Sequence, residues 1–140
     1  PETGAVALLR YAVVDDVGTV MNPLTLKGQI HGGIVQGLGQ VLMENVAYDA
    51  ETGQILGTSF MDYAMPRADS VCKFEVESNP VPTALNPLGA KGAGEAGATG
   101  AVACVANAVH DALAEVGVTY LEMPYTPGRV WAAIRQARRR

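Results

Sequence analysis

Hydrophobic residues recur at helical spacing in three parts of the chain. Within residues 26–45 they occupy every fourth position, which predicts an amphipathic helix with the apolar positions Ile30, Ile34, Leu38 and Leu42. A second helix is predicted from the apolar run that Gly117 ends, formed by Val102, Val105, Val109, Leu113 and Val116. A shorter last helix follows Thr126 and Pro127, with the inner-face residues Val130, Trp131 and Ile134.

Shorter segments have the composition or the alternation of β-strands. Residues 5–14 are rich in Val, Leu and Tyr and end in a turn at residues 15–18, and residues 73–77 alternate as a half-buried strand does. We expect further short strands at residues 19–21, 46–48, 54–58 and 118–121. These elements predict a single α+β domain over residues 1–140, in which two main helices and a short C-terminal helix pack on a mixed or antiparallel sheet.

Composition and charge indicate a globular protein and argue against nucleic-acid binding. Apolar residues make up 49% of the chain and charged residues 17%, which indicates a globular protein with part of its surface covered by another molecule. The net charge is −4, and four of the ten basic residues are in the tail, at Arg135, Arg138, Arg139 and Arg140. The rest has six basic against fourteen acidic residues, a balance of −8, so no nucleic-acid-binding surface is expected.

The sequence also lacks the patterns of a membrane span and of a metal site. No apolar run is long enough to span a membrane and no signal peptide opens the chain, so we expect a cytoplasmic protein. Cys72 and Cys104 are too isolated for a disulfide framework or a zinc site. His31 has no ligand residue four positions away, and His110 lies beside Asp111 on a helix face, so we expect structural roles for both and no metal site.

The most distinctive stretch is the glycine-rich segment of residues 86–97, with the sequence NPLGAKGAGEAG. Its glycines let a ligand approach the main chain, and it leads into a helix N-terminus, where free N–H groups favour negative charge. Glu95 lies at this junction between small neighbours that leave its carboxylate uncovered. Residues 92–97 also fit the dinucleotide pattern G-x-G-x-x-G, but proline-rich sequence precedes them instead of a buried strand, which argues against a dinucleotide-binding domain.

The first helix contains five glycines, at positions 28, 32, 33, 37 and 39. Each costs about 1 kcal/mol relative to alanine in a helix interior, so we expect something to approach the helix closely there. Two explanations are open: another helix packs against these glycines, or a flat ligand or a further backbone does. The side-chain amides of Gln29 and Gln36 favour a ligand, because each amide both donates and accepts hydrogen bonds.

Three motifs follow one another along the chain. They are Gly28-Gln29-x-x-Gly32-Gly33-x-x-Gln36-Gly37-x-Gly39, Phe60-Met61-Asp62-Tyr63-x-Met65-Pro66, and Lys91-Gly92-x-Gly94-Glu95. Together they make the chain resemble the molybdenum hydroxylases, a family that includes xanthine oxidase, the aldehyde oxidases and aerobic carbon monoxide dehydrogenase. The likeness is to the large subunit of the carbon monoxide dehydrogenase branch. It covers nearly the whole chain, which would be the C-terminal portion of a molybdopterin-binding large subunit.

This resemblance implies an activity and a set of site residues. It implies a molybdenum–pterin cofactor in its cytosine dinucleotide form, bound in the complete enzyme and absent from the isolated chain. It implies hydroxylation of carbon monoxide, an aldehyde or an N-heterocycle carbon with water as the oxygen source, and it matches Glu95 to the general base. The cofactor-binding positions that it indicates are Gln29, Gly32, Gly33, Gln36, Lys91, Gly92, Ala93 and Gly94.

The resemblance also implies partners, and a second class of function remains open beside it. The expected partners are the remainder of the molybdopterin-binding subunit and subunits that hold iron–sulfur clusters and FAD. A homo-oligomer is a further option. The isolated chain is expected to be inactive. The alternative is a subunit that folds and contacts partners but catalyses nothing.

Overall fold

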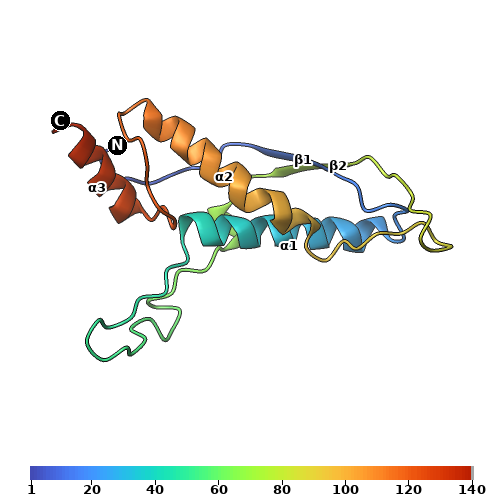
Figure 1. The fold of residues 1–140 in the computed structure, drawn as a ribbon, viewed down its shortest axis with the longest axis horizontal. Helices are drawn as coiled ribbons and strands as arrows, with labels where there is room; N and C mark the ends of the chain where they lie inside the picture. Colours follow the sequence, from blue (N-terminus) through green and yellow to red (C-terminus); the bar gives the residue numbers. More distant parts are fainter. Residues whose placement is uncertain (140) are drawn as a thin grey trace.

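Two long helices form the centre of the fold (Figure 1). In the computed structural model, which describes residues 1–139, helix α1 spans Pro23–Leu42 and helix α2 spans Ala96–Ala114. Asn22 starts α1, because its Oδ1 accepts the backbone N–H groups of Leu24 and Thr25 at 3.0 and 3.2 Å. The two helices pack along each other and contribute most of the buried side chains, including Ile30, Ile34, Leu38, Val41, Ala101, Val105, Val109 and Leu113.

Glycines bring the backbones of the two helices close together. A Cβ atom on Gly33 would lie 2.8 Å from the backbone nitrogen of Ala98, and one on Gly37 would lie 2.6 Å from the Cβ of Ala101. On the opposite helix, a Cβ atom on Gly97 would collide with the carbonyl oxygen of Ile30. Close helix packing therefore explains part of the glycine pattern in α1.

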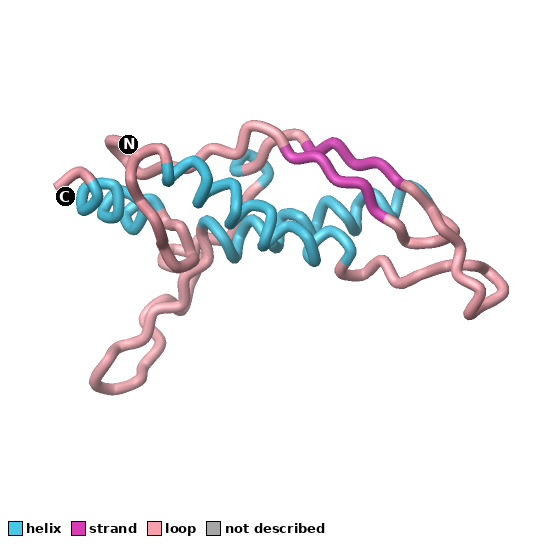
Figure 2. The backbone as a smooth tube through the Cα atoms, turned by 45° about the horizontal axis from the view of Figure 1, so that its top comes forward, coloured by secondary structure: helices cyan, strands magenta, loops and turns pink. Residues whose placement is uncertain are grey.

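Two strands cover one side of the helix pair. Strand β1 (Tyr11–Asp15) and strand β2 (Phe74–Ser78) pair in parallel, with Tyr11 opposite Phe74, and they lie side by side in Figure 2. The α+β class and the three helices are confirmed. The pairing of these strands differs from the expected mixed or antiparallel sheet: α1 lies between them in the sequence, and such a crossover returns the chain in the same direction. Antiparallel pairing occurs only in two isolated bridges within residues 1–139, Gly18–Ala90 and Tyr48–Ile55.

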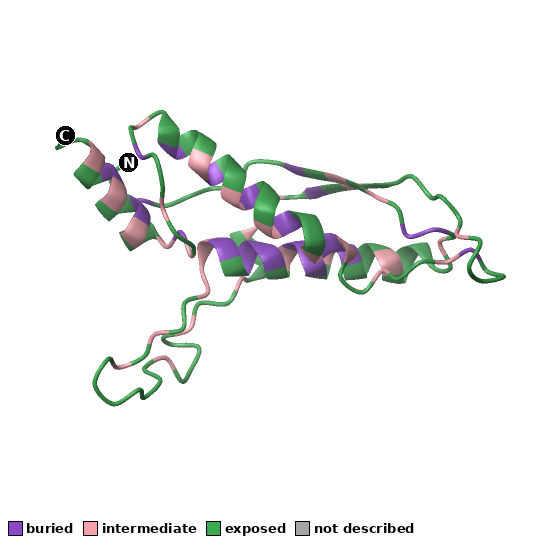
Figure 3. Cartoon of the chain, viewed as in Figure 1, coloured by how far each residue is buried: buried purple, intermediate pink, exposed green. Residues whose placement is uncertain are grey.

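Several shorter predictions fail in their details. Residues 118–121 form no strand, and residues 46–58 pair through a single bridge rather than a hairpin of two strands. This segment instead belongs to an excursion, residues 44–70, that projects away from the helices and is mostly exposed (Figures 1 and 3). The excursion ends in a short 3₁₀ helix, Ala68–Ser70. With few neighbours to pack against, its apolar residues form no sheet.

The last helix, α3 (Pro127–Ala137), completes the core near both chain termini (Figure 1). Val130 and Ile134 are buried, as predicted, at 2% and 4% exposure. Trp131 is 39% exposed and does not belong to the inner face, and the Arg135 guanidinium lies 4.8 Å from the centre of its ring. None of the helices within residues 1–139 is long and apolar enough to cross a membrane.

Candidate functional site

The glycine loop, residues 91–95, connects the coil after β2 to the start of α2. Gln29 on α1 holds one end of it, since its Nε2 donates a hydrogen bond to the carbonyl oxygen of Gly94 at 2.6 Å. Residues 79–89 before the loop contain no strand. The strand–loop–helix arrangement that a dinucleotide fold needs is therefore missing at this point of the chain.

Lys91 holds the other end of the glycine loop. Its backbone N–H donates to the carbonyl oxygen of Val17 at 2.9 Å, and its Nζ forms an ion pair with Oδ2 of Asp16 at 2.5 Å. The other oxygen of Asp16, Oδ1, accepts the backbone N–H groups of Gly18 at 2.9 Å and Val81 at 3.0 Å. The hydrogen bond from Lys91, together with those from Val81 and Gly18, lowers the pKa of Asp16 to about 2.

Glu95 is the N-cap residue of α2, yet its side chain does not cap the helix. The backbone N–H groups of Ala98 and Thr99 instead donate to its carbonyl oxygen, each at 3.0 Å. Lys91, the only nearby cation in sequence, is paired with Asp16. Within residues 1–139 the exposed carboxylate of Glu95 makes no hydrogen bond or salt bridge, so the fold gives it no structural partner.

The main chain of the glycine loop is open to an approaching molecule. A Cβ atom on Gly92 or Gly94 would meet nothing within 4 Å. The backbone N–H groups of residues 92–95 make no hydrogen bond to other residues of the described chain. Unpaired N–H groups at the start of a helix suit a polar or anionic ligand.

A cavity of about 330 Å³ lies between the glycine loop, the first two turns of α1 and the turn after β1. It brings together four of the predicted cofactor-binding residues, which are Gln29, Lys91, Ala93 and Gly94. Gln36 lies outside this cavity, nearly two helical turns further along α1, and is exposed. The neighbouring glycines also separate, because Gly33 faces α2 whereas a Cβ atom on Gly32 would meet nothing within 4 Å.

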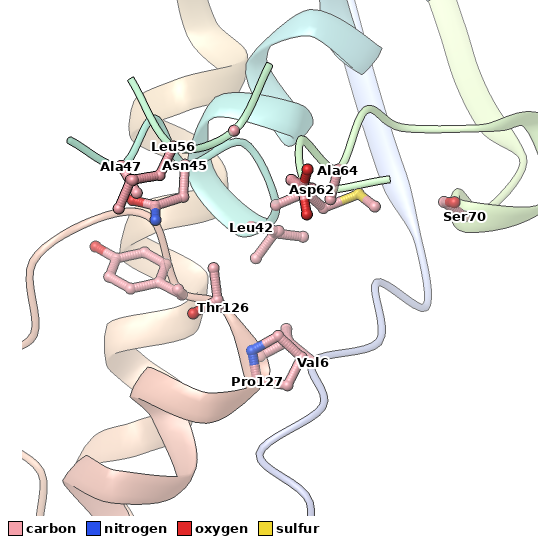
Figure 4. Close-up of a pocket in the computed structure, with 13 residues that line it drawn as sticks. Val6, Leu42, Asn45, Ala47, Leu56, Asp62, Ala64, Ser70, Thr126 and Pro127 are labelled. Atoms are coloured by element: carbon pink, nitrogen blue, oxygen red, sulfur yellow. The ribbon is translucent and has the colours of Figure 1, made fainter. Parts of the chain in front are cut away.

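A larger cavity, of about 710 Å³, lies at the other end of α1 (Figure 4). Leu42, Leu56 and Val6 line it with Asp62 and with residues 125–127, at which α3 begins. It contains no residue of the predicted site. Its lining comes largely from the exposed excursion and from apolar side chains, so this larger cavity offers fewer polar groups for catalysis than its volume suggests.

The two histidines are partly buried, and Nε2 of His31 has no hydrogen-bond partner among residues 1–139. His31 packs edge-on against the Phe74 ring, with 5.5 Å between the ring centres, and Nε2 of His110 lies 2.9 Å from the carbonyl oxygen of Leu121. No group of three or more His, Cys, Asp or Glu residues within residues 1–139 is arranged to hold a metal ion.

The sequence analysis did not identify Asp16. Its hydrogen bond to the N–H two residues later is a common turn pattern for aspartate, which the turn expected at residues 15–18 includes. The pairing with Lys91 spans 75 positions, and no local pattern indicates it. Only the meeting of the β1 turn with the glycine loop places the two side chains together.

Comparison with known proteins decides the family. The family model described as molybdopterin cofactor-binding domain matches residues 1–72. The chain belongs to the molybdopterin cofactor-binding domain family. This match, together with the relatives of the chain and their solved structures, confirms the resemblance that the three motifs indicated.

Individual members of the family resemble most of this chain. It is 38% identical over 130 residues to the carbon monoxide dehydrogenase large chain of Afipia carboxidovorans, and 42% identical over 130 residues to the nicotine 6-hydroxylase large subunit of Paenarthrobacter nicotinovorans. Each alignment covers 93% of this chain and 16% of the relative. The crystal structure of a Cu,Mo-CO dehydrogenase in its carbon monoxide-reduced state superimposes with a TM-score of 0.91 at 37% identity, over 97% of this chain and 17% of that one. The chain thus spans about a sixth of the length of these proteins.

Proposed function

We propose that this chain forms one wall of the cofactor and substrate pocket of a molybdenum-dependent hydroxylase, with Glu95 as its general base. The observation that carries this proposal is the Glu95 carboxylate, which is exposed at the start of α2 without a partner in the described chain. A residue that served the fold would pair with Lys91 or cap the helix, and Glu95 does neither. Its chemistry is therefore available to a molecule outside this chain.

The residues present fit a molybdenum–pterin group. The main-chain N–H groups of Gly92, Ala93 and Gly94 would donate to its polar and phosphate oxygens. These N–H groups have no acceptor in the described chain, and the space beside Gly92 and Gly94 is open to about 4 Å from the position of a Cβ atom. The open Gly32 and the exposed amide of Gln36 would contact the same group from α1, while Gln29 and Gly33 support the loop and α2 from behind. We assign the group to its cytosine dinucleotide form. When bound, it would supply the acceptor for the two electrons of the oxidation.

Glu95 would act through its carboxylate oxygens. In the ionised form they accept a proton from the oxygen that is transferred to an electron-poor carbon, with water as the oxygen source. Its position between Gly94 and Ala96 leaves room for a substrate of small size, such as carbon monoxide, an aldehyde or an N-heterocycle. We further propose that the rest of the large subunit encloses the pocket and that iron–sulfur and FAD subunits remove the electrons, all in the cytoplasm.

The test is turnover at known cofactor content in the complete enzyme with Glu95→Gln. The amide keeps the size of the side chain but does not accept a proton at neutral pH. We expect turnover to fall by about 10²–10⁴, the usual contribution of a general base, while molybdenum per protein stays at the wild-type level. Glu77→Gln on strand β2 is a matched control and should change neither quantity. Near-normal turnover of Glu95→Gln at full molybdenum content would remove Glu95 from the reaction and leave the non-catalytic alternative.

A further inference from the structure

The turn after β1 and the segment after β2 lie together at one end of the molecule, beside the start of α1 (Figures 1 and 2). Their contact fixes the glycine loop at Lys91. We propose that Asp16 is a positioning residue, which sets the place of the glycine loop, and hence of Glu95, through its ion pair with Lys91. The consequence for turnover rests on the proposed role of Glu95, whereas the positioning of the loop does not.

Asp16 connects three separate segments of the chain. One carboxylate accepts the N–H of Gly18 in its own turn, the N–H of Val81 in the coil after β2, and the Nζ of Lys91 at the start of the glycine loop. The two backbone N–H donors hold the Asp16 carboxylate in one orientation independently of its contact with Lys91. This distinguishes the pair from a mobile surface ion pair, whose side chains lose entropy when they meet.

The main chain strengthens the same contact. The N–H of Thr19 donates to the carbonyl oxygen of Gly89 at 3.0 Å, and the N–H of Lys91 donates to that of Val17 at 2.9 Å. These two hydrogen bonds flank the antiparallel bridge between Gly18 and Ala90. Because the turn follows β1 directly, the sheet determines where the glycine loop begins.

The ion pair also assigns a role to the Lys91 side chain. Its ammonium group donates to Asp16, and we assign the side chain to holding the loop rather than to a direct contact with a phosphate. Beyond Lys91, two other side-chain hydrogen bonds reach the loop within residues 1–139, from Gln29 to the carbonyl oxygen of Gly94 and from Thr99 to that of Glu95. Glu95 follows at once, and a displacement of the loop start would therefore move the base. A misplacement of about 1 Å in an active site can lower the rate about 10²-fold.

The test compares Asp16→Asn, Lys91→Gln and the double variant in the full-length, cofactor-loaded protein. Asp16→Asn keeps an oxygen for Gly18 and Val81 but removes the charge that holds Lys91, and Lys91→Gln leaves Asp16 and its backbone hydrogen bonds in place. We expect amide exchange at Thr19 and Lys91 to accelerate about tenfold or more in each single variant, and no further in the double variant. Lys91→Arg, in contrast to Lys91→Gln, should keep the wild-type exchange rate, because arginine retains the positive charge.

Turnover provides the second measurement. We expect kcat to fall about ten- to a hundredfold in Asp16→Asn and Lys91→Gln, with KM and molybdenum content unchanged. The control is Glu75→Gln, which breaks another exposed ion pair, that with Arg10, and should leave exchange at Thr19 and Lys91 and kcat unaltered. If Asp16→Asn does not fold, Lys91→Gln alone decides the question.

Two results would overturn the proposal. Unchanged exchange at Thr19 and Lys91 in both single variants would mean that the loop does not depend on this ion pair. Loss of molybdenum and pterin in Lys91→Gln but not in Asp16→Asn would make Lys91 a direct cofactor contact instead. Faster exchange in Asp16→Asn combined with a fully active Glu95→Gln enzyme would support Asp16 as a positioning residue and reject only the role of Glu95 as base.

Discussion

The backbone nitrogen of Ala98 lies 2.8 Å from the position that a Cβ atom on Gly33 would occupy. Such a distance leaves no room for a methyl group between two backbones, so Gly33 is required by the packing of α1 on α2. The adjacent Gly32 is different, because a Cβ atom there would meet nothing within 4 Å. Of these two neighbouring glycines, Gly33 thus lies in the contact between the helices and Gly32 lies on the outer surface of α1.

Alanine at the two positions should therefore have opposite effects on stability. Gly33→Ala forces α1 and α2 apart, and overpacking of this kind costs about 1–3 kcal/mol. Gly32→Ala meets no steric obstacle and gains helix propensity of up to about 1 kcal/mol. Thermal or denaturant unfolding of the two variants checks this, with each serving as the control for the other. An equal loss of stability in both would show that Gly32 also has a packing partner within the chain.

The sequence predicted the fold best where hydrophobic spacing is regular. The periodic runs around Ile34 and Val105 became α1 and α2, because each run has one apolar face long enough to bury. Residues 118–121 were expected to be a strand, but no other segment within residues 1–139 forms a β-ladder with them. The direction of the β1–β2 pairing depends on the crossover through α1, which spacing within either strand does not reveal.

The candidate site was predicted in part, for a related reason. The glycine loop and Glu95 were visible because their chemistry lies in consecutive residues. The contact of Gln29 with Gly94 and that of Asp16 with Lys91 span 65 and 75 positions, so only the folded chain shows them. Glycine in a helix indicates close approach but not from which side, and Gly33 illustrates this because it faces α2 rather than the outside.

The neighbours Asp15 and Asp16 should titrate in different pH ranges. Hydrogen bonds lower the pKa of Asp16 from its ordinary 3.8 to about 2, so its contribution to stability is present above pH 3.8 and is lost as the pH falls through about 2. Burial raises the pKa of Asp15, whose Oδ2 is buried without a hydrogen-bond partner among residues 1–139. Its protonated form is the stabilised one, so its contribution is present below pH 3.8 and is lost as the pH rises through the raised pKa.

Carboxyl carbon NMR would follow the two side chains separately. We expect Asp15 to lose its proton at a higher pH than an unperturbed aspartate and Asp16 to remain ionised to about pH 2. Lys91→Gln should raise the pKa of Asp16 towards 3.8 and leave Asp15 unchanged, because Lys91 is the largest cause of the Asp16 shift. Coincident titration of the two groups near pH 3.8 would contradict both assignments.

Residues 1–140 purified alone should contain no stoichiometric molybdenum and show no hydroxylase activity. The groups offered to the cofactor are main-chain N–H groups and amides on one open surface, with no cluster of metal ligands within the described residues. Elemental analysis of the purified chain after expression with molybdate measures this directly. About one molybdenum per chain would mean that these residues bind the cofactor without the remainder of a large subunit.

The N-cap residues of α1 and α2, Asn22 and Glu95, provide the sharpest test of whether Glu95 serves the fold. Asn22 Oδ1 accepts two backbone N–H groups at the start of α1, so Asn22→Ala should cost about 0.5–2 kcal/mol of stability. Glu95 makes no such bond at the start of α2, so Glu95→Gln should change stability by less than about 0.5 kcal/mol, as for other surface positions. Denaturant unfolding of both variants in moderate salt, which screens the charge of Glu95 from the helix dipole, measures the two effects together. If Glu95→Gln were as destabilising as Asn22→Ala, the carboxylate would have a structural partner, and its availability as a base would lose its main support.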